Sequence, residues 1–208
     1  MKKYSIFLLI IFIIIGVWFL TAAHINVNAK SVSCVNPTEY SRTKAIEYAE
    51  SCFNKRNNQY YGYGQDCANF VSQCLYSGGM PINGNWYSYK MDDCFFYCGD
   101  VTITWSRAPE QYAYYKKSEF ICKNISIKSI SDIKDAIKEG VQAGDLIYFD
   151  NDIDGTPDHA AMISKVDSGM IYYTAHTFAR YNQPLLNYFK TGNKGQIYIV
   201  MLKDNYQN

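Results

Sequence analysis

The sequence has little net charge, few histidines and no repeated segment. Its 20 lysine and arginine residues balance 19 aspartate and glutamate residues, which gives a formal net charge of +1 at pH 7. Nucleic-acid binding calls for a basic face, so we expect no nucleic-acid partner. The absence of internal repeats and low-complexity tracts excludes a repeat array. At 208 residues, the chain is long enough for one domain with a real core.

The N-terminus contains the long hydrophobic run of the sequence. Met1–Lys3 is basic, Ile6–Leu20 is almost unbroken in its apolar character, and Val27–Ala29 has the small-x-small pattern of a signal-peptidase site. We therefore predict a signal peptide at 1–29 and a single domain at 30–208, in a secreted or cell-surface protein. The alternative is an uncleaved membrane anchor, and membrane contact would then come only through this leader.

Histidine and cysteine usage narrows the chemistry. Removal of the leader takes two lysines and His24, so that 18 basic and 19 acidic residues remain, with His159 and His176 as the two histidines. Cysteines in an exported chain indicate disulfides. If Cys67 keeps a free thiol, six others could form three bridges: Cys34, Cys52, Cys74, Cys94, Cys98 and Cys122. Cys74 also suits a small core residue.

The stretch Asp66–Leu75 has the clearest local pattern. Its apolar residues recur at helical spacing, and Gly78-Gly79 is a typical stop. Asp66 is the predicted N-cap, which places Cys67 in the first helical turn. The helix dipole at that position favours a thiolate, and free backbone N–H groups there can bind an oxyanion.

The rest of the chain reads as helices first and strands after, which indicates an α+β fold. A first helix should open at Pro37-Thr38, and others are expected from Pro109 and over 130–137. Strands are predicted over 101–105, 145–149, 159–166, 170–176 and 196–202.

Several of these segments resemble one family. The run Asp66–Leu75 with Gly78-Gly79, the earlier Tyr40–Arg42 and the later Asp158-His159 look like the putative amidase domain family. That family is a branch of the papain-like cysteine peptidase and amidase fold, related to NlpC-type and CHAP cell-wall hydrolases. The resemblance covers most of the chain after the leader. It implies N-terminal helices with the nucleophilic cysteine at a helix start, followed by an antiparallel sheet that carries the histidine, and it implies no cofactor.

The resemblance and the residue types together suggest a catalytic set. Cys67 is the expected nucleophile, although half of a disulfide or a buried structural thiol would explain the same cysteine. His159 follows it in the order that this fold uses, and an imidazole within reach could take the thiol proton. His176, on the next strand, is our choice for orienting His159. The competing candidates for this third role are Asp158, Asn182 and Asp145.

The connection before the nucleophile should supply the substrate contacts. We expect the backbone N–H of Cys67 and one donor from the segment 60–65 to form the oxyanion hole. Gln65 and Asp66 are candidates there, with Gln65 closer to the nucleophile than the glutamine of papain-like enzymes. Tyr61 and Tyr63 are expected to line the substrate groove, although tyrosines are also ordinary rim residues.

One acidic turn resembles the start of a calcium loop. Asp150, Asp152 and Asp154 alternate before Gly155, but the twelfth position is Ala161 rather than a bidentate glutamate. A polar turn between two strands explains the same residues. We therefore predict no metal site, with these three aspartates as the metal candidates.

Together these features predict an exported, monomeric cysteine amidase or peptidase. The relation to cell-wall hydrolases implies peptidoglycan peptide or amide bonds as substrate. Two alternatives stay open: an exported protease or transamidase that acts on proteins, and a catalytically inactive wall-binding module whose cysteines are all in disulfides. The sequence contains no recognisable wall-binding repeat.

Overall fold

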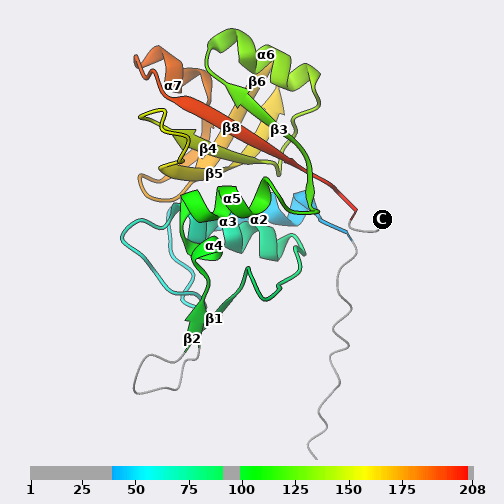
Figure 1. The fold of residues 1–208 in the computed structure, drawn as a ribbon, viewed down its shortest axis with the longest axis vertical. Helices are drawn as coiled ribbons and strands as arrows, with labels where there is room; N and C mark the ends of the chain where they lie inside the picture. Colours follow the sequence, from blue (N-terminus) through cyan, green and yellow to red (C-terminus); the bar gives the residue numbers. More distant parts are fainter. Residues whose placement is uncertain (1–38, 91–98, 206–208) are drawn as a thin grey trace, which may run out of the picture. The chain divides into compact units, whose positions relative to one another are not determined.

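The computed structural model describes residues 39–90 and 99–205. They lie within the unit Asn36–Asn208, which is built on a six-stranded antiparallel sheet with helices on both faces (Figure 1). The predicted α+β class with an antiparallel sheet is confirmed. The predicted leader at 1–29 and the helix start at Pro37-Thr38 lie outside the described residues.

The sheet has the strand order β3-β8-β4-β5-β6-β7, and β1 and β2 pair separately. Its central strands match the predicted ones, whereas β3 and β7 were not predicted. The strands are β1 (Ser88–Lys90), β2 (Gly99–Val101), β3 (Ile121–Ile127), β4 (Leu146–Asp150), β5 (His159–Asp167), β6 (Met170–Ala175), β7 (Arg180–Pro184) and β8 (Gln196–Leu202).

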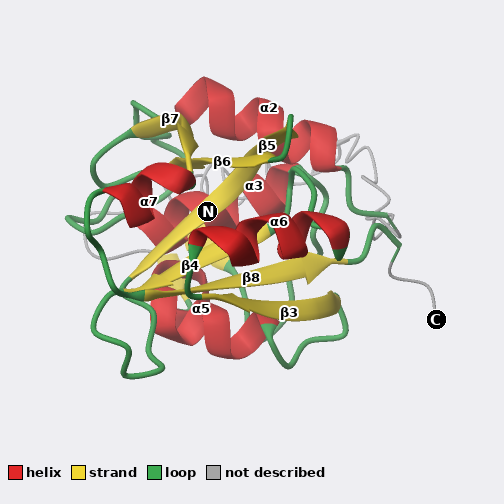
Figure 2. Ribbon diagram, turned by 90° about the horizontal axis from the view of Figure 1, so that it is seen from above, coloured by secondary structure: helices red, strands yellow, loops and turns green. Residues whose placement is uncertain are grey.

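Two groups of helices cover the sheet, one on each face (Figure 2). The first face is covered by α2 (Arg42–Cys52), α3 (Cys67–Ser77), α4 (Ile103–Ser106) and α5 (Ala108–Tyr115). The second face is covered by α6 (Ile130–Lys138) and α7 (Leu186–Lys190). The predicted helices at Cys67, at Pro109 and over 130–137 are therefore confirmed.

Side-chain alternation along β4 and β5 divides the core into two clusters. Leu146, Tyr148, Ala160 and Met162 pack with the α3 cluster. Ile147, Phe149, Ala161 and Ile163 pack with the α6 cluster. The sheet thus buries both faces, and the end of β5 that carries His159 comes close to the start of α3.

The predicted strand over 101–105 is wrong in its second half, which forms α4. The Trp105 ring is fully buried and lies 4.5 Å, centroid to centroid, from that of Trp86. Its indole Nε1–H donates to Asn69 Oδ1 at 2.9 Å. Burial of this ring against α3 therefore decides the local conformation over the strand propensity of the Val-Thr-Ile-Thr run.

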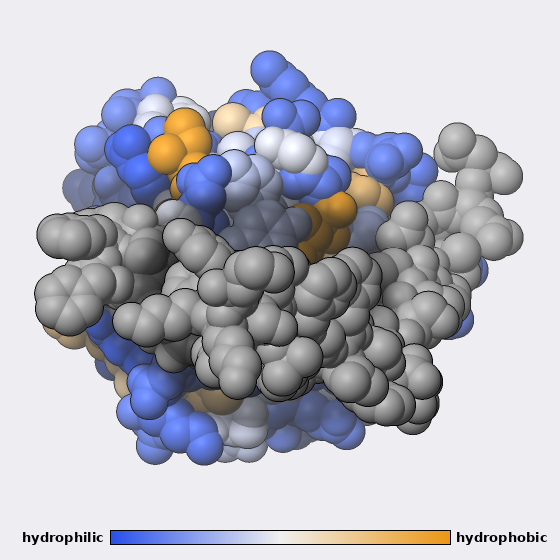
Figure 3. Space-filling view, turned by 90° about the horizontal axis from the view of Figure 1, so that it is seen from below, coloured by the Kyte–Doolittle hydropathy of each residue, from blue (hydrophilic) through white to orange (hydrophobic). Residues whose placement is uncertain are grey.

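Among the described residues, α2 is the first helix, and it begins at Arg42. Ser41 is its N-cap, and the Ser41 Oγ accepts a 3.4 Å hydrogen bond from the Lys44 N–H. No helix within 39–90 or 99–205 has the length and apolar character needed to cross a membrane. Where Figure 3 shows described residues on the face seen from below, most of them are hydrophilic.

Candidate active site

Cys67 is the first residue of α3 and lies against β5. Its side chain is buried, with 6% exposed. Ala68 on α3 and Ala160 on β5 are both fully buried. Because an alanine side chain is a single methyl group, α3 and β5 can pack closely against each other. The Cys67 sulfur consequently meets the backbone amides of Ala160, Ala68 and Cys67 itself.

His159 opens β5 and shares a cavity with Cys67. The strand register places it opposite Phe149 on β4, and the two ring centroids are 5.7 Å apart. A cavity of ≈ 300 Å³ is lined by both Cys67 and His159. The two residues that the sequence singled out as nucleophile and base therefore border one space, although they come from different layers of the fold.

Burial makes the uncharged form of both groups the favoured one. It raises the pKa of the Cys67 thiol, and the nearby backbone amides oppose this rise without cancelling it. Burial also lowers the pKa of His159 to about 4, with the Arg180 cation acting in the same direction and Asp158 against it. The predicted lowering of the thiol pKa by the helix dipole is therefore outweighed by desolvation.

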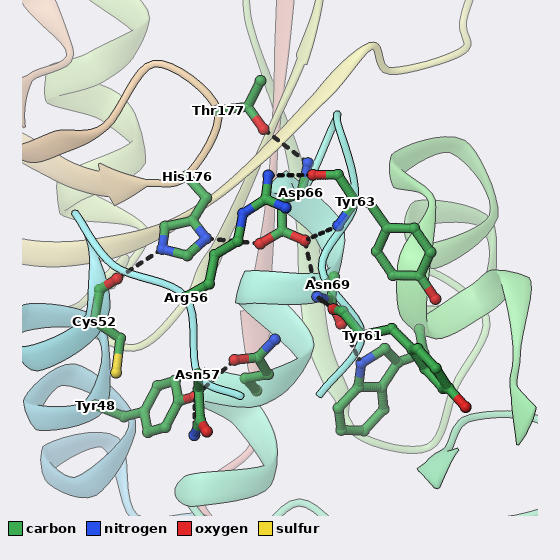
Figure 4. Close-up of polar contacts among 12 residues, drawn as sticks. Tyr48, Cys52, Arg56, Asn57, Tyr61, Tyr63, Asp66, Asn69, His176 and Thr177 are labelled. Atoms are coloured by element: carbon green, nitrogen blue, oxygen red, sulfur yellow. Dashed lines mark hydrogen bonds and ion pairs between the residues drawn. The ribbon is translucent and has the colours of Figure 1, made fainter. Parts of the chain in front are cut away.

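The structure gives His176 a different place from the predicted one. Its Nδ1 lies 2.9 Å from Asp66 Oδ2 and its Nε2 lies 2.6 Å from the Cys52 carbonyl oxygen (Figure 4). Its ring also stacks on Phe70, with the ring centroids 4.1 Å apart. Both ring nitrogens are thus engaged away from His159. The prediction that His176 orients His159 by a hydrogen bond is wrong, because Ala175 packs with the α6 cluster and the next side chain turns towards α3.

Two of the three competing candidates for the third role, Asp145 and Asp158, are also bound elsewhere, whereas Asn182 Oδ1 has no hydrogen-bond partner among the described residues. Asp145 is fully buried in an ion pair with Arg42, with the Asp145 Oδ1 to Arg42 Nη1 distance at 2.7 Å. Asp158 accepts hydrogen bonds from the backbone N–H and side-chain amide of Asn151. The His159 ring makes no hydrogen bond to any residue of 39–90 and 99–205, so its orientation comes from the Phe149 contact and the strand backbone.

Asp66 precedes α3 but does not cap it. Its side chain accepts no hydrogen bond from the backbone N–H groups of the first helical turn. Instead its carboxylate accepts from the Tyr63 N–H at 3.0 Å and from the Asn69 amide at 2.9 Å, and it pairs with His176 (Figure 4). Asp66 therefore leaves the N–H groups at the start of α3 uncapped, as an oxyanion hole at Cys67 would require.

Of the predicted residues before Asp66, Gln65 borders the cavities, whereas Tyr61 and Tyr63 hold the segment in place through their backbone. Gln65 lines the cavity of Cys67 and His159, as well as a second cavity of ≈ 250 Å³ on which Cys67 also borders. Tyr61 and Tyr63 line neither of these two cavities. The Tyr61 carbonyl oxygen accepts from the Asn69 amide, and the Tyr63 carbonyl oxygen accepts from Arg56. Gln65, the oxyanion candidate, therefore borders both cavities, whereas the two tyrosines predicted to line the groove do not.

Several lining residues were not anticipated. Thr177, Phe178 and Arg180 come from the turn after β6 and the start of β7, and Tyr173 and Tyr188 complete an aromatic wall with Phe149. Thr177 and Phe178 have φ angles of 57° and 64°, a conformation that is unfavourable for such residues. Because β7 itself has little hydrophobic alternation, no sequence signal placed Arg180 at this cavity.

The cysteines of the described segments are unpaired. Cys52, Cys67, Cys74 and Cys122 carry free thiols. Cys74 is fully buried in the α3 core, as its helical position suggested. The expectation of three bridges among the six other cysteines is therefore wrong for Cys52, Cys74 and Cys122. Cys34, Cys94 and Cys98 lie outside the described residues.

The acidic turn gathers a partly different set of aspartates from the predicted one. Oxygens of Asp150, Asp152 and Asp158 lie within 4.8 Å of one another. Asp154 instead donates its backbone N–H to Asp150 at 3.2 Å and accepts from the Thr156 N–H. Hydrogen bonds within the turn account for this arrangement as a polar loop.

Comparison with known proteins places these residues in a family. Residues 39–200 match the family described as "Putative amidase domain". Two Bacillus subtilis (strain 168) proteins, both called uncharacterized, are similar: YhbB is 28% identical over 72% of this chain, and YjcM is 29% identical over 86%. The chain spans 41% of the length of each of these relatives. No solved structure matches the chain. With the match extending from the start of α2 to β8, the chain belongs to the putative amidase domain family.

Proposed function

We propose that this protein is a cysteine-dependent amide hydrolase with Cys67 as nucleophile and His159 as base, on a papain-like arrangement of helix and sheet. One observation carries the proposal: both side chains line the same ≈ 300 Å³ cavity, with the thiol at the uncapped start of α3. A thiol, a base and free backbone donors in one cavity are the parts that acyl transfer from an amide needs.

The reaction would start from the neutral pair. As the Cys67 sulfur attacks the amide carbon, its proton passes to His159, whose lowered pKa keeps the imidazole ready to accept it. The backbone N–H of Cys67, with Gln65 near by, would hold the oxyanion. The imidazolium then protonates the leaving nitrogen, and a thioester and a free amine result. Water, deprotonated by His159, then attacks the thioester carbon, the C–S bond breaks, and the carboxylic acid is released while the imidazolium returns the proton to the Cys67 sulfur.

Export and the cell wall are further parts of the proposal. The leader pattern at 1–29 supports export, and the resemblance to NlpC-type and CHAP hydrolases supports peptidoglycan peptide or amide bonds as substrate. Hydrolysis or transamidation of proteins is the second candidate, since the same cavity chemistry would serve it. An inactive module with all cysteines in disulfides has no such support, because the Cys67 thiol is free.

Digestion of purified peptidoglycan would test the proposal. The protein, its Cys67→Ala and His159→Ala variants, and a Cys122→Ala control are incubated with it, and new amine ends are identified by mass spectrometry. Cys122 is an exposed free thiol on β3, so its removal should leave cleavage intact. We expect cleavage by the protein and the control alone.

The other outcomes discriminate between the alternatives. Cleavage that persists in Cys67→Ala would refute cysteine catalysis. If peptidoglycan is not cleaved but a peptide library is cleaved in a Cys67-dependent way, the substrate is a protein rather than peptidoglycan. A Cys67 thiol that resists alkylation in the native protein would argue for the binding module.

A further inference from the structure

Arg180 brings an unneutralised cation to the cavity of Cys67 and His159. It is the first residue of β7, where the backbone pairs with Ala175 of β6. Its side chain is exposed at the cavity, and it forms no ion pair with any carboxylate of residues 39–90 and 99–205. Arg107, Lys123, Lys138 and Lys165, by contrast, each form an ion pair with an aspartate or a glutamate. A guanidinium beside the reacting groups is free to bind a carboxylate of a ligand.

The surroundings of Arg180 fit a ligand with an anionic end on an apolar body. Phe149, Tyr173 and Tyr188 form one wall of the cavity, and Phe178 stands at it with 81% of its surface exposed. Asp158, the acidic residue in the lining, is held by two hydrogen bonds from Asn151 rather than by Arg180. The Arg180 charge is therefore directed to the cavity without a protein counter-ion.

The turn before Arg180 is fixed in place. Thr177 and Phe178 have positive φ angles, which cost on the order of 1–3 kcal/mol each and persist only where the surroundings impose them. The Thr177 Oγ accepts from the Asp66 N–H at 2.7 Å, one residue before the nucleophile. This bond ties the segment that presents Phe178 and Arg180 to the start of α3.

Cys67 borders two cavities, and their lining residues suggest which half of a substrate each would hold. Both are lined by Gln65, Cys67 and Asp158, but His159 lines only the one that contains Arg180. A general acid must reach the leaving nitrogen to protonate it. The amine half of the substrate therefore belongs in the cavity of His159 and Arg180, and the acyl half belongs in the second cavity, beside Arg107 and the start of α5.

From this geometry we propose that Arg180 is a specificity residue that binds a carboxylate on the amine side of the scissile amide. The inference rests on the proposed cysteine hydrolase and deepens it by naming the substrate class: amides whose leaving amine carries a carboxylate close to the nitrogen, as an amino acid does. A bound carboxylate would also neutralise the cation that helps to lower the pKa of His159, so the correct substrate would strengthen the base.

A matched pair of thiol reagents tests the charge preference without a known substrate. Iodoacetate and iodoacetamide differ in a carboxylate, and each alkylates a thiol by displacing iodide. Their rates are measured on the full-length protein by mass spectrometry of the peptides that contain Cys67 and, as an internal reference, the exposed Cys122. We expect the iodoacetate to iodoacetamide ratio at Cys67 to exceed that at Cys122 by about tenfold, the order of one ion pair near a protein surface.

Three variants make the result specific. Arg180→Gln should bring the ratio at Cys67 down to that at Cys122, and Arg180→Lys should retain part of it. Lys138→Gln, which removes an exposed cation on α6 that lines neither cavity, should leave the ratio unchanged. In the hydrolysis assay, Arg180→Gln should remove the preference for a leaving residue with a free carboxylate over its carboxamide. Cleavage of the carboxamide form should continue.

Failure of the inference and failure of the proposed function are distinguishable. A reactive Cys67 whose reagent ratio is the same in the parent protein and Arg180→Gln would overturn the carboxylate site and leave the hydrolase standing. A Cys67 that neither reagent alkylates in the native protein would overturn the hydrolase, and the carboxylate site with it.

Discussion

Replacement of Asp66 by asparagine should destabilise the whole site. The Asp66 side chain is buried and accepts from the Tyr63 N–H and the Asn69 amide, and its other oxygen lies 2.9 Å from His176 Nδ1. In Asp66→Asn, an amide group must face either the His176 ring or the Tyr63 and Asn69 donors. Loss of hydrogen bonds to a buried carboxylate costs about 1.5–3 kcal/mol each in the free energy of unfolding, and we expect a loss of about 3 kcal/mol because one oxygen remains.

The pH dependence of that loss follows from the Asp66 pKa. Burial acts to raise it, but the hydrogen bonds from His176, Asn69 and Tyr63 prevail and hold it below the ordinary value of 3.8. The carboxylate therefore contributes its full stabilisation above about pH 4, and this is lost as the pH falls through the folded-state pKa. The difference in the free energy of unfolding between the parent protein and Asp66→Asn should be constant near neutral pH and should become smaller below pH 4.

Urea unfolding at pH 7 and at pH 3 measures both effects. Asp167→Asn, which removes an exposed partner of Lys165, serves as the control and should change stability little. A double-mutant cycle with His176→Gln should show that the two losses do not add, since the residues are in contact. Equal stability of Asp66→Asn and the parent at pH 7, or a gap that widens on acidification, would refute the reasoning.

Three further outcomes follow from the structure. Arg180→Gln should shift the acidic limb of the rate to higher pH, because it removes a cation that lowers the pKa of His159; an unmoved limb in the kcat/KM profile would contradict this. Asp145→Asn should cost about 3–5 kcal/mol in urea unfolding by removing the buried charge that pairs with the partly buried Arg42, which retains only the exposed Asp204 as an ion-pair partner, yet spare native-state alkylation of Cys67. Ala160→Leu should slow that alkylation and cost about 1–3 kcal/mol by overpacking the helix–strand contact, and a normal alkylation rate would show that the contact does not set the site.

Periodicity predicted most of the framework that positions the site. The helix from Cys67, the strand from His159 and their neighbours β4, β6 and β8 have clear patterns because each buries at least one face in a core cluster. By contrast, β7 is an edge strand with no fully buried residue, and none of the residues of α7 is buried. Their sequences therefore lack the periodic pattern of apolar residues from which a strand or a helix is predicted.

The third catalytic role shows where sequence reasoning fails. His176 lies one residue beyond β6, and adjacency to His159 in a hairpin could be inferred only approximately. A shift of one residue in strand register moves a side chain to the opposite face of the sheet. The ring accordingly packs on Phe70 beneath the sheet, and its partner is Asp66, 110 residues earlier in the chain.

The division of the reactive pair between two layers has a mechanical consequence. The Cys67 sulfur belongs to α3 and the His159 imidazole to β5, and these two elements pack in one core cluster in which Ala68 and Ala160 are fully buried. A close-packed interface has low compressibility, so the packing of α3 against β5 should hold the distance between the proposed nucleophile and the proposed base constant. Lengthening a surface loop elsewhere should leave this distance unchanged, whereas a shift of α3 along the sheet should slow the proposed reaction.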